Sequence, residues 1–184
     1  MRKALLIARK ALPVALMAVG LVAGIVPVGV AGAAQPSWSG DYSLKRFAAS
    51  KHGTSLAASQ SEPDFADTYT FATDCSGGPC VATVIGGPPP DNPTLPQPAT
   101  YTWDGTSWVH LYDWRWDCYM GAGVEKVWQD AHSEAYYTPQ PDGTLIGSWT
   151  TWITEEGPCQ GTVTMDVAAY PVRPHPPAFG SSGS

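Results

Sequence analysis

The stretch SWVHLYDWRWDCYM, residues 107–120, holds the side chains best suited to contact a ligand. In a β-strand, alternate residues point to opposite faces. One face would carry the rings of Trp108, His110, Tyr112, Trp114 and Trp116, followed by Cys118. The second half of the other face is charged, with Asp113, Arg115 and Asp117, which is typical of an exposed row of ion pairs. We therefore expect the aromatic face to point inward.

Two interpretations of this aromatic face remain open. The rings could fill the core of a small β-domain, as large aromatic side chains usually do. They could instead line a cavity or groove, because aromatic side chains with a few polar groups are typical of ligand sites. His110 would then be one such polar group, and Trp149 or Trp152 could approach from a neighbouring strand. Indole rings suit a sugar, an acyl chain or another flat molecule, and the sequence does not choose among them.

Recognisable catalytic motifs are absent from the sequence. It contains no Gly-x-Ser-x-Gly elbow, no phosphate-binding glycine loop and no His-Glu-x-x-His. The adjacent Glu155 and Glu156 would point to opposite faces of a strand, so they do not form a carboxylate pair. A hydrolase whose two carboxylates meet only through folding is the least favoured alternative. No cofactor is indicated.

The four cysteines predict two disulfides in an exported protein. Among the three pairings that four cysteines allow, we favour Cys75 with Cys80 and Cys118 with Cys159. The first pair flanks SGGP, a tight turn that could bring two strand ends within bonding distance. The alternative is a metal site, but Cys-x4-Cys is a loose spacing for zinc and no histidine lies close by in the sequence. No metal is therefore expected.

Residues 1–34 have the pattern of a signal peptide. A basic start precedes an apolar run from Ala11 to about Val30, and the small residues 31–34 suit cleavage. An uncleaved anchor is the alternative, because the run is nearly long enough to span a bilayer. Two prolines in the run and the small-residue exit favour cleavage, so no stable anchor is expected. Since no twin arginine is present, we expect export through the general secretory route, to the medium or the cell envelope.

Charge narrows the range of partners. Four of the ten basic residues lie in this N-terminal segment, whereas all sixteen acidic residues follow it. The mature chain is therefore strongly acidic, which disfavours nucleic acid and anionic membrane surfaces. The remaining candidates are a small-molecule, carbohydrate or lipid ligand, or another protein of the cell envelope.

Residues 35–170 predict a single β-domain, because Gly and Pro separate segments rich in Thr, Tyr, Trp and Val. Apolar and polar residues alternate in GTVTMDVAAY, residues 161–170, and Leu145, Trp149 and Ile153 share a face of TLIGSWTTWIT. Asp104-Gly105 predicts a hairpin. Seven or eight such strands joined by short turns predict an all-β fold, a disulfide-stapled, small antiparallel up-and-down barrel or strongly curved sheet. The alternative is a two-sheet β-sandwich.

Three segments fall outside this strand pattern. SLKRFAASK, residues 43–51, is the one stretch compatible with a helix, although it also fits a strand or loop. GGPPPDNPTLPQP, residues 86–98, predicts a loop, because proline lacks the N–H that a central strand needs. We interpret it as a stiff connection or flap. The tail, residues 171–184, is predicted to be disordered.

The segments WSGDY, DCSGGPCVATV, YTWDGTSWV and GPCQGTVTMDV resemble those of small exported proteins from mycobacteria and related actinomycetes. The resemblance implies an exported β-rich domain and brings no catalytic residue with it. WSGDY is also similar to the Gly-x-Trp strand that opens lipocalin-like barrels, with Tyr42 in place of the tryptophan. The favoured function is a secreted barrel-like module that binds a small or extended ligand on its aromatic face. The alternative is a protein-interaction or structural component of the cell envelope.

Overall fold

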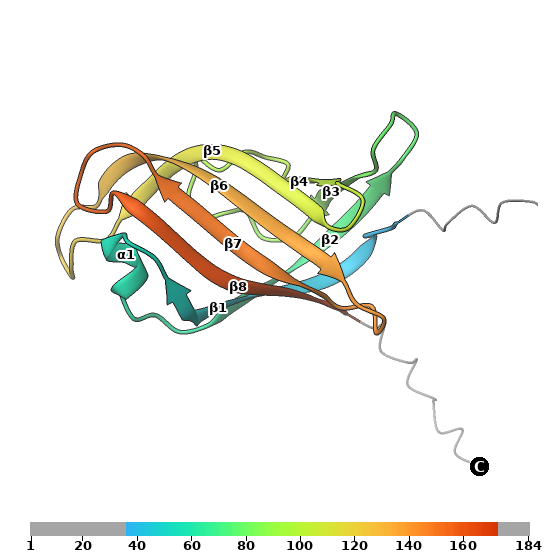
Figure 1. Cartoon of the computed structure of the whole chain (residues 1–184), viewed down its shortest axis with the longest axis horizontal. Helices are drawn as coiled ribbons and strands as arrows, with labels where there is room; N and C mark the ends of the chain where they lie inside the picture. Colours follow the sequence, from blue (N-terminus) through green and yellow to red (C-terminus); the bar gives the residue numbers. More distant parts are fainter. Residues whose placement is uncertain (1–35, 173–184) are drawn as a thin grey trace, which may run out of the picture. The chain divides into compact units, whose positions relative to one another are not determined.

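In the computed structural model, which describes residues 36–172, eight antiparallel strands close into a barrel (Figure 1). Each strand pairs with the next along the chain, and β8 pairs with β1 to complete the closure. The strands are β1 (Gly40–His52), β2 (Phe65–Asp74), β3 (Val81–Gly86), β4 (Thr100–Trp103), β5 (Trp108–Cys118), β6 (Val127–Pro139), β7 (Leu145–Ile153) and β8 (Gly161–Pro171). The up-and-down barrel predicted from the sequence is therefore confirmed, and the sandwich is not formed.

Alternation along each strand decides which side chains enter the barrel. On β8, Val163, Met165 and Val167 are buried, as their period of two predicts. On β7, Leu145 and Ile153 are buried on the face that was assigned to them from the sequence. On these two strands, the apolar residues of the alternation thus face the barrel interior.

Packed rings close the barrel end at which β5 begins. Trp38, just before β1, is fully buried there. Its ring stacks on Phe71 with the ring centres 4.2 Å apart, and the ring of Tyr101 meets it at 4.8 Å. The Trp38 backbone N–H donates to Oγ1 of Thr73 at 2.9 Å, which fastens this segment to the end of β2. Trp108 completes the cluster.

A short helix, α1 (Leu56–Ser59), lies at the opposite barrel end, next to β8 and β1 (Figure 1). Ser55 caps it: its Oγ accepts from the Ala57 N–H at 3.2 Å and donates to the Cys159 carbonyl at 2.6 Å. Ala57 is buried in a second hydrophobic cluster, which includes Trp114 and Cys118. The helix therefore closes part of this end.

Both predicted disulfides, Cys75–Cys80 and Cys118–Cys159, are formed, and the described residues contain no free cysteine. The first spans the β2–β3 turn. The second joins the end of β5 to the turn before β8. Such bonds are typical of proteins outside the cytosol.

Three sequence-based predictions concern residues 43–51 and the two ends of the chain. Residues 43–51 belong to β1, so the helical alternative is wrong. The proposed signal peptide, residues 1–34, lies outside the described residues, as does the tail beyond Val172; β8 itself continues to Pro171. Among the residues that the structure describes, no helix has the length and apolar character needed to cross a membrane.

Candidate functional site

The aromatic face of β5 points into the barrel, as predicted. Its inward side chains are all buried or partly buried, and they are those of Trp108, His110, Tyr112, Trp114, Trp116 and Cys118. The alternate residues Leu111, Asp113 and Arg115 are exposed. The barrel interior, however, is not uniform along this row, and the rings fall into three environments.

Two of the predicted tryptophans are part of the packed interior. Trp108 is fully buried between Trp38 and Trp103, with ring centres 6.2 and 5.3 Å away. Trp114 donates its indole N–H to Oγ of Ser133 at 2.8 Å. The interpretation that the rings fill a core therefore holds for Trp108. Trp114 belongs to the second hydrophobic cluster and also lines a cavity described below.

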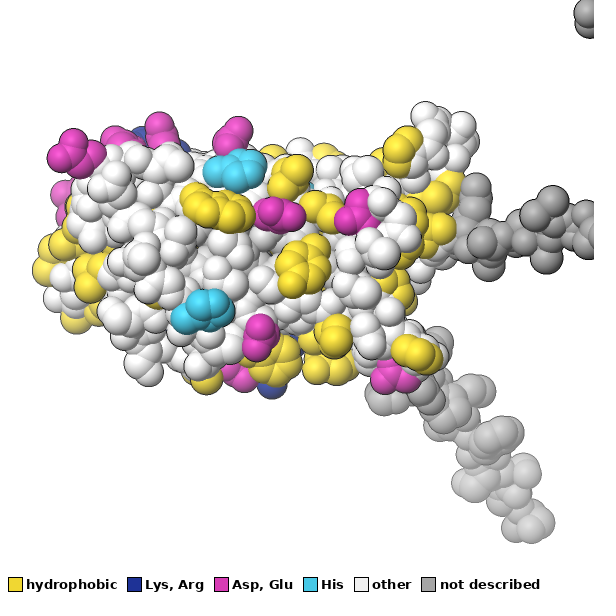
Figure 2. Space-filling view, in the orientation of Figure 1, with side chains coloured by type: hydrophobic (Ala, Val, Ile, Leu, Met, Phe, Trp, Pro, Cys, Tyr) yellow, Lys and Arg dark blue, Asp and Glu magenta, His cyan; other side chains and the backbone are white. Residues whose placement is uncertain are grey.

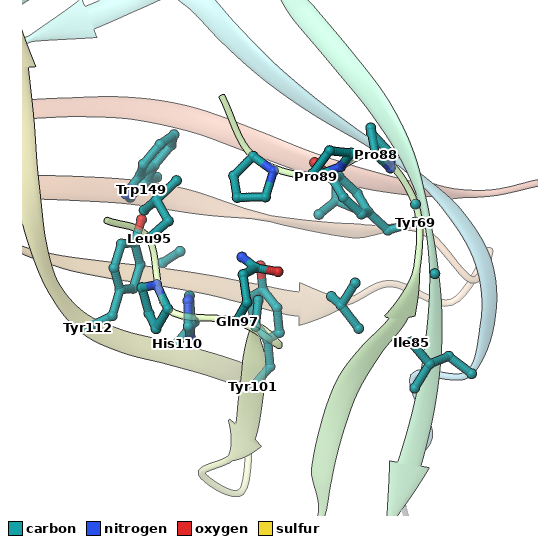
Figure 3. Close-up of a pocket in the computed structure, with 18 of the residues that line it drawn as sticks. Tyr69, Ile85, Pro88, Pro89, Leu95, Gln97, Tyr101, His110, Tyr112 and Trp149 are labelled. Atoms are coloured by element: carbon teal, nitrogen blue, oxygen red, sulfur yellow. The ribbon is translucent and has the colours of Figure 1, made fainter. Parts of the chain in front are cut away.

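Between these rings the interior is hollow. A cavity of about 350 Å³, here called the aromatic cavity, lies inside the barrel wall (Figure 3). Its aromatic lining consists of Tyr69, Tyr101, His110, Tyr112, Tyr137 and Trp149. Ligand pockets for small molecules span roughly 300–1,000 Å³ and have this largely aromatic character. Three of the seven residues predicted from the sequence, His110, Tyr112 and Trp149, meet in this cavity.

The proline-rich loop, residues 87–99, forms the outer wall of the aromatic cavity. β4 has four residues and pairs with β5 only near Trp108 and Val109, so no strand covers the following half of β5 on that side. Leu95 of the loop lines the cavity there, beside Tyr112 and Trp149, whereas Pro88 and Pro89 line it on the side of Tyr69 (Figure 3). The stiff connection predicted from the sequence is thus also a wall of the candidate site.

A glycine allows the loop to begin close to β2. Gly87 has a φ of +132°, a conformation that favours glycine. A Cβ atom at this position would overlap the ring of Tyr69 and would lie 2.9 Å from the carbonyl oxygen of Thr68. The absence of a side chain therefore lets the loop pack directly on a ring that lines the aromatic cavity.

The polar groups of the aromatic cavity are mostly neutral. Nδ1 of His110 lies 2.7 Å from the carbonyl oxygen of Thr100, so this nitrogen carries the proton. Burial lowers the pKa of His110, which keeps the ring uncharged at neutral pH, although the hydrogen bond to Thr100 acts against this effect. Burial raises the pKa of Tyr101 and Tyr112, and that of Tyr137 to about 12. The hydroxyls therefore stay protonated and can donate hydrogen bonds to a ligand.

A second hollow, here called the α1 cavity, lies at the helical end of the barrel and measures about 370 Å³. Trp114, Trp116 and Trp149 line it, so Trp149 contributes to both cavities. Nε1 of Trp116 is buried and has no hydrogen-bond partner among residues 36–172. Charged side chains surround this space, including Lys51, which pairs with Glu62 at 2.8 Å. The pair of Lys51 with Glu62 and the more exposed pair of Lys126 with Asp117 balance the charges that line the α1 cavity.

Trp152 does not lie where the sequence suggested. Its side chain points outward from β7 and is 37% exposed, because it has the opposite parity to Trp149. It packs near the ring of His132, with the ring centres 5.9 Å apart. On the face in Figure 2, hydrophobic side chains over the middle of the barrel are scattered among polar ones. Trp152 therefore does not line the aromatic cavity.

The exposed charged row of β5 forms ion pairs, as predicted. Arg115 pairs with Asp130 at 3.3 Å, and the carboxylate of Asp117 pairs with Lys126. Pairs of this kind on a surface contribute little to stability. Within residues 36–172, no three His, Cys, Asp or Glu side chains are grouped so that they could hold a metal ion.

Comparison with known proteins gives the fold a precedent. No family model matches the chain, and no curated protein does. Among solved structures, the monomer form of the PknI sensor domain of M. tuberculosis has a similar fold, with a TM-score of 0.56 and 15% identity. The match covers 78% of this chain and 93% of that one. This likeness shows a common β-barrel architecture.

The PknI sensor domain is a mycobacterial protein, and its β-barrel agrees with the β-rich fold implied by the resemblance to small exported mycobacterial proteins.

Sequence analysis did not single out several residues of the site, because their roles depend on closure of the barrel. They are Arg46 of β1, Tyr69 of β2, Leu95 of the loop, Tyr101 of β4 and Tyr137 of β6. A signal was present for Arg46: it alternates with Leu44 and Ala48, both of which are buried.

Proposed function

We propose that this chain is an exported barrel module that binds one small ligand in the aromatic cavity. The observation that carries the proposal is the hollow of about 350 Å³ bounded by His110, Tyr112 and Trp149. Barrels of about eight strands can hold one small ligand, and sites of this kind combine aromatic walls with a few polar groups. A structural or protein-interaction component of the envelope would need no such hollow.

Two further observations support this proposal. The two disulfides fit a protein that works outside the cytosol, in agreement with the predicted signal peptide and the general secretory route. The neighbour of similar fold is described as a sensor domain, and ligand binding in this chain would suit a sensing or carrier role. The ligand would enter past the proline-rich loop, because that wall is made of exposed residues such as Pro89 and Gln97.

Tryptophan fluorescence of the purified domain, screened against sugars, lipids and cell-wall fragments, tests the proposal. Titration calorimetry of any compound that responds then compares Trp149→Phe with Trp152→Phe, since these side chains lie on opposite faces of β7. We expect Trp149→Phe to weaken binding and Trp152→Phe to leave it unchanged. Equal effects of the two changes, or no response to any class of compound, would contradict the proposal.

A further inference from the structure

Arg46 is held inside the barrel by strand pairing. On β1 it lies opposite Val167 of β8, and opposite residues of antiparallel neighbours share a face. Val167 is 2% exposed, so this face is the inner one. Its neighbours in the alternation, Leu44 and Ala48, are also buried. The guanidinium therefore reaches the aromatic cavity, where Arg46 is the one permanently charged side chain of the lining.

Arg46 forms no ion pair with the carboxylates of residues 36–172. The other basic side chains of residues 36–172 each pair with at least one carboxylate: Lys45 with Asp64, Lys51 with Glu62, Arg115 with Asp130 and Glu155, and Lys126 with Asp117. None of the ion pairs among these described residues includes Arg46. In a chain with sixteen acidic residues, an unpaired arginine inside the barrel is unexpected. Arg46 is half-buried, and a charge that is partly withdrawn from water without a partner is costly, so such a group is typical of a binding site.

Two aromatic rings contact the guanidinium. The carbon Cζ of Arg46 lies 5.2 Å from the centre of the Phe65 ring and 5.3 Å from that of Trp149. The positive charge thus lies over the faces of both rings, which attract a cation. The N–H donors lie in the guanidinium plane and match a planar carboxylate in a two-point contact, which ammonium groups do not provide.

Neighbouring hydroxyls share this environment. Burial raises the pKa of Tyr69, and the positive charge of Arg46 acts against this rise. The negative charges of Asp67 and Asp91 also raise the pKa of Tyr69. Neither carboxylate forms an ion pair with Arg46. The protonated hydroxyl of Tyr69 can therefore donate to the same anion that the guanidinium pairs with.

We infer that the ligand of the aromatic cavity is an apolar or aromatic monocarboxylate whose carboxylate pairs with Arg46. This inference rests on the proposed function and names the ligand class. The rings of Tyr112, Tyr137 and Trp149 would surround the apolar body, and Arg46 and Tyr69 would bind the carboxylate. Acyl chains and flat aromatic acids share this chemistry, so both kinds of probe are needed to distinguish them.

The test compares acids with their uncharged methyl esters on the same protein. The probes are cis-parinaric acid and 2-naphthoic acid, each with its methyl ester, titrated by fluorescence into the full mature domain. The variants are Arg46→Gln and, as a matched loss of one positive charge outside the cavity, Lys45→Gln, which removes the surface pair with Asp64.

We expect at least one acid to bind about tenfold or more tightly than its own ester, which is the scale of a charge-assisted contact. This preference should be the same in the unmodified protein and in the Lys45→Gln variant. Arg46→Gln should lose this preference yet still bind the ester, which also shows that the variant is folded. Should Arg46→Gln fail to fold, Arg46→Lys serves instead, and a reduced preference for the acid is expected because the planar contact is lost.

The outcomes separate the two proposals. Equal binding of acid and ester to the unmodified protein, or an acid preference that survives Arg46→Gln, overturns the carboxylate assignment and leaves ligand binding intact. Binding of neither acid nor ester overturns the carboxylate assignment, and the proposed function falls with it if the wider screen is also negative. The acid that binds more tightly identifies the acyl or the aromatic source.

Discussion

Nδ2 of Asn92, in the middle of the proline-rich loop, donates a 2.8 Å hydrogen bond to the backbone carbonyl of Arg115 on β5. Oγ1 of Thr94 accepts from the Arg115 N–H at 3.0 Å, so both backbone groups of one residue are bound by the loop. Asn92 is 8% exposed although it lies in a loop. These bonds replace the strand pairing that the short β4 leaves out, and they hold the wall of the aromatic cavity in place.

Replacing Asn92 with alanine should loosen this wall without unfolding the barrel. The change removes hydrogen bonds worth about 1 kcal/mol each, so backbone amides in residues 87–99 should exchange with solvent faster. Hydrogen exchange followed by mass spectrometry measures this effect. Gln140→Ala is the matched control, because Nε2 of Gln140 also donates to a backbone carbonyl, that of Thr138, in a different turn. Unchanged exchange in the loop of the Asn92 variant would contradict its anchoring role.

The two disulfides should differ in their contribution to stability. The two cysteines of Cys118–Cys159 have a sequence separation of 41, whereas those of Cys75–Cys80 have a separation of 5. Replacing both cysteines of a pair with alanine should lower the free energy of unfolding by about 4 kcal/mol for the larger loop and about 2 kcal/mol for the smaller one. Denaturant titrations of the two double variants measure these losses. A greater loss from the smaller loop would contradict the chain-entropy explanation.

His110 should make stability depend on pH. Burial lowers its pKa, and the neighbouring rings of Tyr101 and Tyr112, with centres 4.9 and 4.3 Å away, remain uncharged. The unfolded chain binds this proton with a pKa of about 6.5. The folded state binds it less readily, so stability is full above that pH and falls as the pH decreases toward the lowered folded pKa.

Urea denaturation at pH 7 and pH 5.5 measures this dependence. His110→Gln should lose less stability between the two pH values than the unmodified protein, because the glutamine does not titrate. His52→Gln changes an exposed histidine and should follow the unmodified protein. An identical pH dependence in all three proteins would show that His110 does not carry the effect.

Gly147 should tolerate no side chain. It lies on β7 opposite Tyr137, and a Cβ atom would collide with the carbonyl oxygen of Tyr136. Gly147→Ala should therefore force β6 and β7 apart and lower the free energy of unfolding by about 2–4 kcal/mol. Gly77→Ala is the control, because a Cβ there would meet nothing within 4 Å. Thermal unfolding compares the two, and equal stabilities would refute the predicted collision.

Local patterns were sufficient to predict most of the barrel. Alternation identified the inner faces of β7 and β8, and Asp104-Gly105 marked the β4–β5 hairpin, in which the Asp104 carboxylate accepts from the backbone N–H groups of Thr106 and Ser107 at 2.8 Å. The disulfide pairing was favoured because Cys75 and Cys80 flank a tight turn, and this pairing is formed. These features depend on residues that are close in sequence or on a period of two.

The site was harder to predict because it depends on closure. Arg46 enters the aromatic cavity only because β1 pairs with both β2 and β8. The segment that contains it was compatible with a helix, so its parity carried little weight. Trp152 illustrates the converse: its residue type suggested a ligand contact, but its parity relative to Trp149 places it outside. Likewise, the prolines predicted a loop without showing which part of the barrel the loop covers.

The most direct test of an internal site is an NMR titration of the ¹⁵N-labelled domain that follows the signals of the indole N–H groups. The probe is whichever of cis-parinaric acid and 2-naphthoic acid binds more tightly in the fluorescence titrations. Trp149 lies on the face of β7 that points into the barrel, and Trp152 lies on its outer face, so their signals report on the two sides of the barrel wall. The account predicts that the Trp149 signal shifts with saturation and that the Trp152 signal does not move. A shift of Trp152 alone, or no shift of Trp149 at saturating probe, would contradict it.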